Sequence, residues 1–394
     1  MKPLSSIKVL DLSRVLAGPF CTMILNDLGA EVIKVEVPGT GDDSRGYGPF
    51  IKGKSAYFIS VNRGKKSISL NLKAEKGKQI LLELVKKCDV VVENFRPGTM
   101  EKLGLGYDFL KTINPRLIYA ATSGYGHTGP DAQKPGYDIL VQAAGVMGIT
   151  GWPGMPPTRV GLSMGDLTGG LYLTIGTLTA LYQRAITGQG QKIDISLLDC
   201  QVAYLENAII RYQADGKNPE PIGNRHPTIT PFQAYKASDN YFVVGVGSES
   251  LWKTFCTAIG REELYTHTLF ATNKSRTENI EALNLILDPL FNNKTVAEWL
   301  EILGHYGIPC APINTIDMLL ADPQIHARNM LLEVNDPVTG PLKIAGNPIK
   351  MTSLPDTSTC LPAPDIGQNN EDVFSELLGF DKETINALKA GGVI

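Results

Sequence analysis

Strand-like and helix-like segments alternate through the first half of the chain, and this alternation limits the fold more than any other feature. The strand-like segments are nearly continuous apolar runs, which are typical of parallel strands buried on both faces. The helical segments repeat their apolar residues every three or four positions. Such alternation predicts an α/β fold with a doubly wound parallel sheet and right-handed crossovers. The expected strands are SIKVLDLS (6–13), EVIKVEVP (31–38), SISLNL (67–72), DVVVENF (89–95), RLIYAATSGYG (116–126) and QKIDISL (191–197).

Proline-rich stretches divide the 394 residues into parts, as expected for a chain too long for one typical domain. We predict a large domain at 1–212, a linker at 213–232 and a small α/β domain at 233–325. A linker and a C-terminal segment at 326–394 complete the chain. Within the small domain, NYFVVGVG is expected to be a hairpin strand, and Thr295 with Glu298 predicts a capping box at a helix start.

Composition excludes several classes of function. A net charge of −3 argues against a nucleic-acid partner held by bulk electrostatics. No apolar run is long enough to span a bilayer, and the N-terminus lacks the apolar stretch of a secretory signal. The six cysteines are scattered and the histidines lie far apart, so neither a disulfide framework nor a metal site is expected. These features predict a cytoplasmic protein with no membrane contact.

The segment GLSMGDLTGGLY (161–172) carries one charge, Asp166, among glycines. One interpretation makes Asp166 an N-cap that accepts backbone N–H bonds at a helix start. The other makes it a nucleophile that stays ionised because the helix dipole favours an anion. On the second interpretation, glycines at 165, 169 and 170 leave room for a bulky ligand.

Three loops carry groups that suit phosphates. VLAGPFC (15–21) is interpreted by itself as a simple turn, with backbone N–H groups presented to a phosphate at a helix start as the alternative. VENFRPGTMEKLGL places Asn94, Arg96 and Lys102 just after a strand, where ligands bind in open α/β sheets. A charge pair on a solvated loop is the alternative. The basic cluster NRGKKS (62–67) is interpreted as a solvated turn, with a phosphate site as the alternative.

Several motifs in order resemble the family III CoA-transferases, the CaiB/BaiF group. They include VLDLSRVLAGPFCTMILNDLGAEVIKVEVPGTGDDSR, VENFRPGTMEKLGL, INPRLIYAATSGYGHTGP, MGDLTGG and GIPCAPINTIDMLLADPQ, and together they cover essentially the whole chain. The resemblance implies a large Rossmann-like domain, a smaller domain and a C-terminal segment that returns to the large one. It also implies a homodimer whose two subunits interlock.

The resemblance implies a role for Asp166 as the nucleophile that attacks an acyl-CoA thioester. The products are a mixed anhydride and CoA thiolate, and an aspartyl-CoA thioester follows. Coenzyme A is then both substrate and product, a carboxylic acid is the partner, and no metal or ATP is required. Relatives that are racemases carry histidine where this chain has Tyr137, which is a poor general base. Tyr137 and Asp138 therefore look transferase-like.

By the same matching, a set of residues is expected to contact CoA. Val37 and Pro135 depart from the family, since some members carry arginine and lysine there, which puts those two contacts in doubt. The matched residues are Val15, Leu16, Ala17, Asn71, Leu72, Lys73, Asn94, Phe95, Arg96 and Lys102.

The stretches PTRVGLSMGDL and IGNRHPTITPFQAY resemble succinyl-CoA-dependent dicarboxylate transferases. We expect Arg159 or Arg225 to pair with the distal carboxylate of a succinyl-type group. The alternatives are a formyl-CoA or acetyl-CoA:oxalate CoA-transferase and a 2-methylacyl-CoA racemase.

Overall fold

The computed structural model describes residues 2–394, which group into two compact units. The first unit comprises the residues up to Val146, with 160–215 and 323–394, and the second comprises 147–159 and 216–322. The compact units change at 215 and 322, and the domain boundaries expected from the sequence stay a prediction. The segment 147–159 groups with the second unit, which no sequence pattern indicated.

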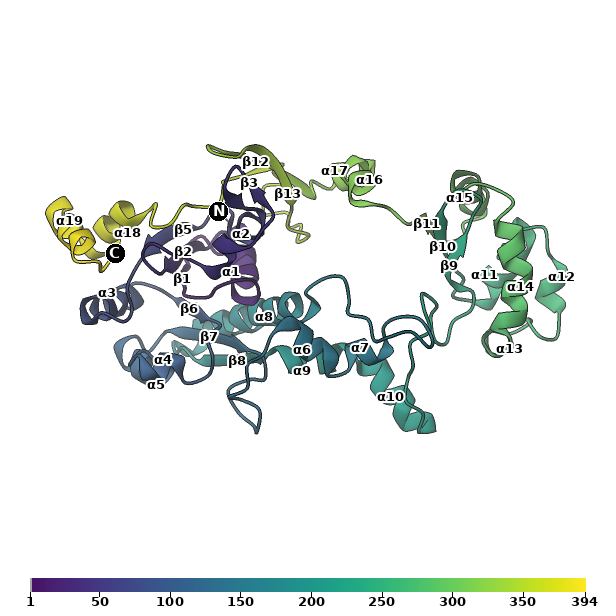
Figure 1. Ribbon diagram of the computed structural model, residues 1–394, viewed down its shortest axis with the longest axis horizontal. Helices are drawn as coiled ribbons and strands as arrows, with labels where there is room; N and C mark the ends of the chain where they lie inside the picture. The colour runs from purple at the N-terminus through teal and green to yellow at the C-terminus, as the bar shows by residue number, and fades with distance from the viewer. Residues whose placement is uncertain (1) are drawn as a thin grey trace. The chain divides into compact units, whose positions relative to one another are not determined.

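A parallel sheet of six strands, counted within residues 2–394, forms the centre of the first unit (Figure 1). Its order is β5-β2-β1-β6-β7-β8, and every neighbouring pair is parallel. The expected α/β fold is therefore confirmed. The strands are β1 (Lys8–Asp11), β2 (Glu31–Glu36), β5 (Lys66–Ser69), β6 (Val90–Glu93), β7 (Ile118–Ser123) and β8 (Lys192–Ser196).

Alternating side chains of these strands enter separate hydrophobic cores, one on each face of the sheet. Leu10 and Val91 pack with α3 (Glu75–Val85), and Val9 and Val90 pack with α1 (Ala17–Asp27) and α8 (Met164–Thr187). The other helices of the unit are α2 (Ala56–Asn62), α4 (Thr99–Lys102), α5 (Tyr107–Ile113), α6 (Asp138–Ala143), α9 (Leu197–Tyr204), α10 (Glu206–Asp215), α17 (Pro323–Ala327) and the 3₁₀ turn η1 (Asp43–Gly46).

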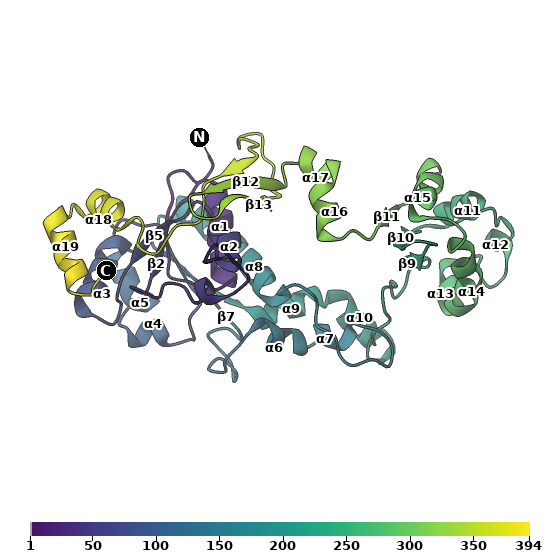
Figure 2. The ribbon, with the colours of Figure 1, turned by 45° about the horizontal axis from the view of Figure 1, so that its top comes forward.

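The C-terminal helices α18 (Asn370–Leu378) and α19 (Lys382–Ala390) lie beside α3 at the β5 edge of the sheet (Figures 1 and 2). The Ser67 and Ser69 amides of β5 donate to the side chains of Asn369 and Asn370, at 2.9 and 2.8 Å. The last part of the chain is thus part of the first unit. Small strands complete the unit: β3 (Phe50–Ile51), β4 (Lys54–Ser55), β12 (Leu331–Asp336), β13 (Gly340–Ala345) and β14 (Thr359–Cys360).

The second unit is built on a small sheet in the order β11-β10-β9. The expected strand 240–247 forms β10 and pairs antiparallel with β9, as a hairpin should. Thr295 and Glu298 form the predicted capping box of α15. The elements are β9 (Phe232–Lys236), β10 (Tyr241–Gly245), β11 (Cys310–Pro312), α11 (Glu249–Ala258), α12 (Glu263–Thr266), α13 (Asn273–Glu278), α14 (Ile280–Phe291), α15 (Val296–His305) and α16 (Ile316–Ala321), while α7 (Val146–Ile149) spans the junction of the units.

Candidate active site

The direction of the strand order reverses between β1 and β6, and loops from their carboxyl ends open into cavities there. We call a cavity of about 690 Å³ the strand-end cavity, because the loops after β1, β2, β5 and β6 line it. A further cavity of about 300 Å³ contains Asp166 and is called the Asp166 cavity. Arg14, Asp43 and Phe95 line both, so the cavities adjoin.

Asp166 lies in the first turn of α8, but it is not the N-cap, as one interpretation had it. Ser163 occupies that position, three residues earlier. No hydrogen bond to the Asp166 carboxylate is found within residues 2–394, so its oxygens have no competing protein donor. Burial of the carboxylate raises its pKa to about 7, and the nearby charge of Asp138 adds to the rise. The expectation that the helix start keeps Asp166 fully ionised is therefore wrong.

The glycines around Asp166 admit protein neighbours rather than a ligand, contrary to expectation. A Cβ at Gly165 would lie 2.6 Å from Val141, and one at Gly169 would lie 2.3 Å from Leu197. A Cβ at Gly170 would lie 2.7 Å from the carbonyl oxygen of Ala17 in α1. The three glycines therefore let α6, α9 and α1 approach α8 closely and fix the position of its first turns.

Tyr137 and Asp138 begin α6 and differ in what they face. Tyr137 lines the Asp166 cavity and is 70% exposed. Asp138 is buried and does not line that cavity: its Oδ1 accepts from the Gly165 N–H at 2.7 Å, and its Oδ2 accepts from Gln142 at 2.8 Å. Asp138 thus supports the start of the helix that carries Asp166, in addition to its electrostatic effect.

The side chain of Asn94 joins the loop after β6 to the loop after β1. The Arg14 amide donates to Asn94 Oδ1 at 2.9 Å, and Asn94 Nδ2 donates to the Arg14 carbonyl at 2.7 Å. The Arg14 guanidinium pairs with Asp43 at 2.9 Å and lies over the Phe95 ring. Arg14 was not singled out from the sequence, although its place just after a strand would have been a usable signal.

The residues matched to CoA contacts divide between the two cavities. Val37 and Pro135, the departures from the family pattern, line the strand-end cavity and the Asp166 cavity respectively. Asn71, Leu72, Lys73 and Lys102 line the strand-end cavity, whereas Val15, Leu16, Ala17, Asn94 and Arg96 line the Asp166 cavity, and Phe95 lines both.

The basic cluster at 62–67 is neither a solvated turn nor a phosphate site. Arg63 is buried and pairs with Asp27 at 2.6 Å, while Lys65 is buried and pairs with Asp11 at 3.0 Å. Lys66 pairs with Glu31 at 2.7 Å. These cations are committed to carboxylates of the first unit.

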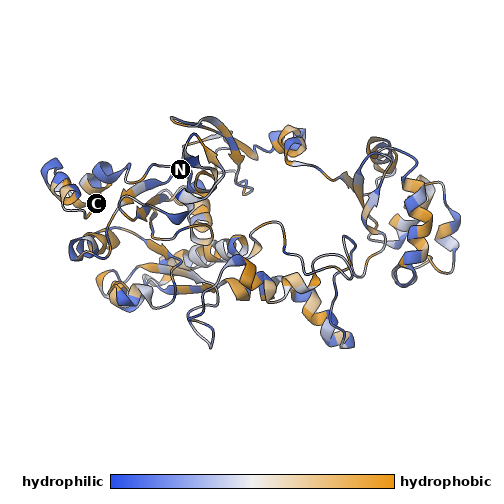
Figure 3. Ribbon diagram, viewed as in Figure 1, coloured by the Kyte–Doolittle hydropathy of each residue, from blue (hydrophilic) through white to orange (hydrophobic). Residues whose placement is uncertain are grey.

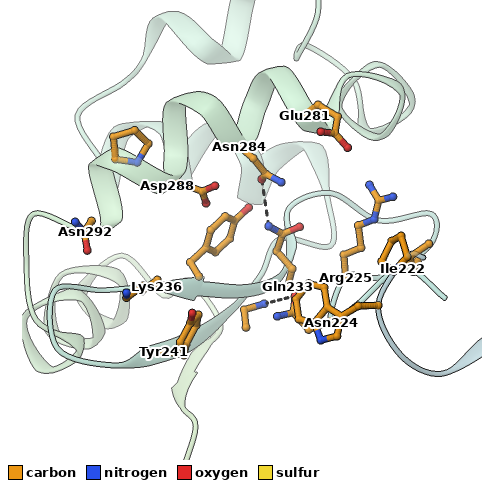
Figure 4. Close-up of a pocket in the computed structure, with 15 residues that line it drawn as sticks. Ile222, Asn224, Arg225, Gln233, Lys236, Tyr241, Glu281, Asn284, Asp288 and Asn292 are labelled. Atoms are coloured by element: carbon orange, nitrogen blue, oxygen red, sulfur yellow. Dashed lines mark hydrogen bonds between the residues drawn. The ribbon is translucent and has the colours of Figure 1, made fainter. Parts of the chain in front are cut away.

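Arg159 and Arg225 belong to the second unit. Arg225 lines a cavity of about 670 Å³ within that unit, between β9 and α14 (Figure 4). There, Gln233 donates to Asn284 at 3.1 Å, and Asp288 projects from α14 toward the same space. The assignment of either arginine to a substrate carboxylate stays a prediction.

Comparison with protein families decides the class of protein. The family model for CoA-transferase family III matches residues 4–370. The chain belongs to CoA-transferase family III. It is 45% identical to an acetyl-CoA:oxalate CoA-transferase of Acetobacter aceti, over 93% of each chain. It is 40% identical to a human succinyl-CoA:glutarate CoA-transferase, over 100% of this chain and 90% of that one.

A solved structure supports the same conclusion. A CaiB/BaiF family protein from Brucella suis superposes with a TM-score of 0.84 at 39% identity, covering 95% of this chain and 99% of that one. The family and the enzyme class expected from the sequence are confirmed, and the racemase alternative gains no support. Within the described residues, no helix is long and apolar enough to cross a membrane, and no cluster of His, Cys, Asp or Glu side chains suits a metal ion.

Proposed function

We propose that the chain transfers CoA from succinyl-CoA to a free dicarboxylic acid, with Asp166 as the covalent nucleophile. One observation carries this proposal: an aspartate with no hydrogen-bond donor lies in a cavity that adjoins a larger one at the strand ends. A carboxylate held in that way can reach a thioester without first breaking a protein contact. In a member of CoA-transferase family III, this arrangement supports acyl transfer through an aspartyl intermediate.

The chemistry balances without an outside source of energy. An oxygen of Asp166 attacks the thioester carbonyl, the C–S bond breaks, and CoA leaves as thiolate from a mixed anhydride. The thiolate then attacks the aspartyl carbonyl, which releases the acyl group as a free carboxylate and leaves an aspartyl-CoA thioester. The acceptor carboxylate attacks that thioester and forms a second anhydride with release of thiolate. The thiolate attacks the acceptor carbonyl, which gives the new acyl-CoA and restores Asp166.

The raised pKa of Asp166 serves this chemistry in two ways. At a pKa of about 7, about half of the enzyme carries the carboxylate near neutral pH. A more basic carboxylate is also a better nucleophile once it is ionised.

The strand-end cavity is proposed to hold the nucleotide part of CoA. Lys73 and Lys102 line it and offer cations to phosphates. Arg14, Asp43 and Phe95 line both cavities, so the pantetheine arm would pass them on its way to Asp166. The sheet order, which matches that of dinucleotide-binding folds, supports the Rossmann-like description of this unit.

The acceptor is proposed to be a dicarboxylate because oxalate and glutarate, named in the two relatives, are both diacids. Arg159 or Arg225 would pair with the carboxylate that does not react. Acetyl-CoA is the second candidate for the donor, and the 45% identity with the Acetobacter aceti protein favours it. Neither donor changes the proposed role of Asp166.

The proposed assembly is an interlocked homodimer in the cytoplasm. Tyr182 and Ile186 on α8 are 72% and 70% exposed, and α10 has no buried residue at all within the described chain. Figure 3 shows apolar residues along α9 and α10, and Ile210 of α10 is among the exposed ones. Exposed apolar side chains of this kind are candidates for an interface with a second copy of the chain. Light scattering on the purified protein should give the mass of two chains.

Trapping of the covalent adduct tests the nucleophile. Wild-type protein is incubated with succinyl-CoA or acetyl-CoA and a panel of acids, treated with hydroxylamine during turnover, and mapped by peptide mass spectrometry. We expect a hydroxamate at Asp166, dicarboxylates as the best acceptors, and no transfer by Asp166→Asn. Asp108→Asn is the matched control, because Asp108 also lies in the first turn of a helix but is exposed. A label at another residue, or transfer by Asp166→Asn, would refute the proposal.

A further inference from the structure

Val15 adopts a backbone conformation that its side chain disfavours. Its φ is 66°, in the left-handed region, where a branched Cβ crowds the backbone. The other non-glycine residues with positive φ in the described chain are Lys52 and Asn329, neither of which is β-branched. Such a conformation persists only where the surroundings impose it. Val15 begins the loop 15–17 that lines the Asp166 cavity.

Asp42 supplies one of the contacts that impose this conformation. The Val15 N–H donates to Asp42 Oδ1 and Oδ2 at 3.0 and 3.3 Å, across 27 residues of sequence. The same carboxylate accepts from the Ser44 amide at 2.8 Å and from its hydroxyl at 2.7 Å, as the N-cap of η1. Asp42 is therefore also held by Ser44, independently of its bonds to Val15.

Lys34 contacts both Asp42 and the backbone that precedes Val15. Its ammonium lies 2.7 Å from Asp42 Oδ2 and donates to the Ser13 carbonyl at 2.8 Å. The side chains of Lys34 and Asp42 are each only 1% exposed. Burial by itself would raise the pKa of Asp42, but the Lys34 charge and the Ser44 bonds outweigh it and lower the pKa to about 2. The pair is thus fully ionised at neutral pH, and it holds both sides of the turn from Ser13 to Val15.

The loop 15–17 packs against the helix that carries Asp166. A Cβ at Gly18 would lie 2.2 Å from Ser13 Cβ, so the loop closes tightly on itself. The Ala17 carbonyl in turn packs against Gly170 of α8, one turn after Asp166. The loop and the carboxylate are therefore parts of one packed arrangement.

We propose that Asp42 and Lys34 are positioning residues for the transfer reaction, which hold Val15 in its left-handed conformation and so set the loop 15–17 against Asp166. Neither side chain touches the reacting atoms in this role. The inference rests on the proposed function of the Asp166 cavity. It means that the buried Lys34–Asp42 ion pair affects the rate of the reaction as well as the stability of the fold.

A double-mutant cycle tests the inference, because glycine adopts the left-handed conformation without strain. Asp42→Ala should lower kcat about 10- to 100-fold, the range expected for misplacement of a reacting group. Because Asp42 also lines the strand-end cavity, KM for acyl-CoA is measured separately from kcat. Val15→Gly alone supplies the reference kcat for the cycle, because Val15 itself lines the Asp166 cavity. If Asp42 acts by holding Val15, the double variant should recover kcat to within about threefold of Val15→Gly.

The control variant is Asp336→Ala. Asp336 is also a buried carboxylate, paired with Lys54 at 3.0 Å and bonded to the amides of Val338 and Thr339, but it lines neither cavity. It should lower the melting temperature and leave kcat unchanged. Should Asp42→Ala fail to fold, the same cycle is measured with Asp42→Asn. This variant should lose about 3- to 10-fold in kcat, and Val15→Gly must again restore it.

Two results separate the possible failures. If the wild-type protein transfers CoA but the losses in kcat of the two single variants multiply in the double variant, the positioning role alone would be overturned. A wild-type protein that transfers no CoA between any tested acids would overturn the proposed function instead. Recovery of kcat without recovery of the melting temperature would support the inference most directly, because a purely structural role predicts that kcat and the melting temperature change together.

Discussion

Asp138 accepts a hydrogen bond from the N–H of Gly165, at 2.7 Å, immediately before Asp166 in the sequence. The same carboxylate raises the pKa of Asp166 through its charge, after the larger effect of burial. Asp138 therefore fixes the start of α8 and adjusts the ionisation of the side chain that we propose as nucleophile. These effects can be separated by substitution.

Asp138→Asn should shift the pH dependence of the reaction to lower pH. The amide can still accept from Gly165, but without the negative charge the Asp166 pKa should fall. Asp138→Ala also removes the acceptor, so kcat should fall further, by about 10- to 100-fold. The measurement is kcat against pH for each variant. An Asn variant whose profile coincides with that of the wild type would contradict the electrostatic role.

The rate of enzyme acylation in the wild type should rise with pH through about 7. Asp166 attacks only when ionised, and its folded-state pKa of about 7 means that the reactive fraction grows from pH 6 to pH 8. A plot of the CoA burst against pH should follow the loss of one proton. A burst that is constant from pH 5 to pH 8 would show that the carboxylate is already ionised at pH 5.

Asp166→Asn should stabilise the protein at pH 8 but much less at pH 4. The folded-state pKa of Asp166 lies above its ordinary value of 3.8, so ionisation costs the folded state free energy. This cost is absent below pH 4, grows as the pH rises toward 7, and reaches up to about 4 kcal/mol. Thermal unfolding of the variant and the wild type at both pH values measures it. Asp108→Asn, which alters an exposed carboxylate, should show no comparable gain, and equal gains for both would be evidence against the cost.

Gly170→Ala should destabilise the protein by about 1 to 3 kcal/mol and lower kcat, because its Cβ would meet the Ala17 carbonyl at 2.7 Å. Gly304→Ala, in α15, is the matched control. A Cβ there meets nothing within 4 Å, so alanine should stabilise the helix by about 0.5 to 1 kcal/mol. Denaturant unfolding compares the two variants, and a destabilising effect of equal size at both glycines would count against the close approach of α1 and α8.

Local sequence information was enough for much of the fold. The apolar runs at 89–95 and 116–126 became β6 and β7, because a strand buried on both faces needs little beyond its own residues to be recognised. The capping box of Thr295 and Glu298 formed as expected, since its partners are three residues apart.

The tertiary structure decided burial, ionisation and the purpose of the glycines. Lys65 looked like part of a solvated turn, yet it is buried against Asp11, 54 residues earlier in the chain. Asp166 was expected to be ionised, but burial and Asp138 raise its pKa, and Gly170 serves α1 rather than a ligand. Strand patterns and caps depend on neighbours within a few residues, so the sequence displays them. The pKa and the packing of a side chain depend on which distant segments the fold places against it.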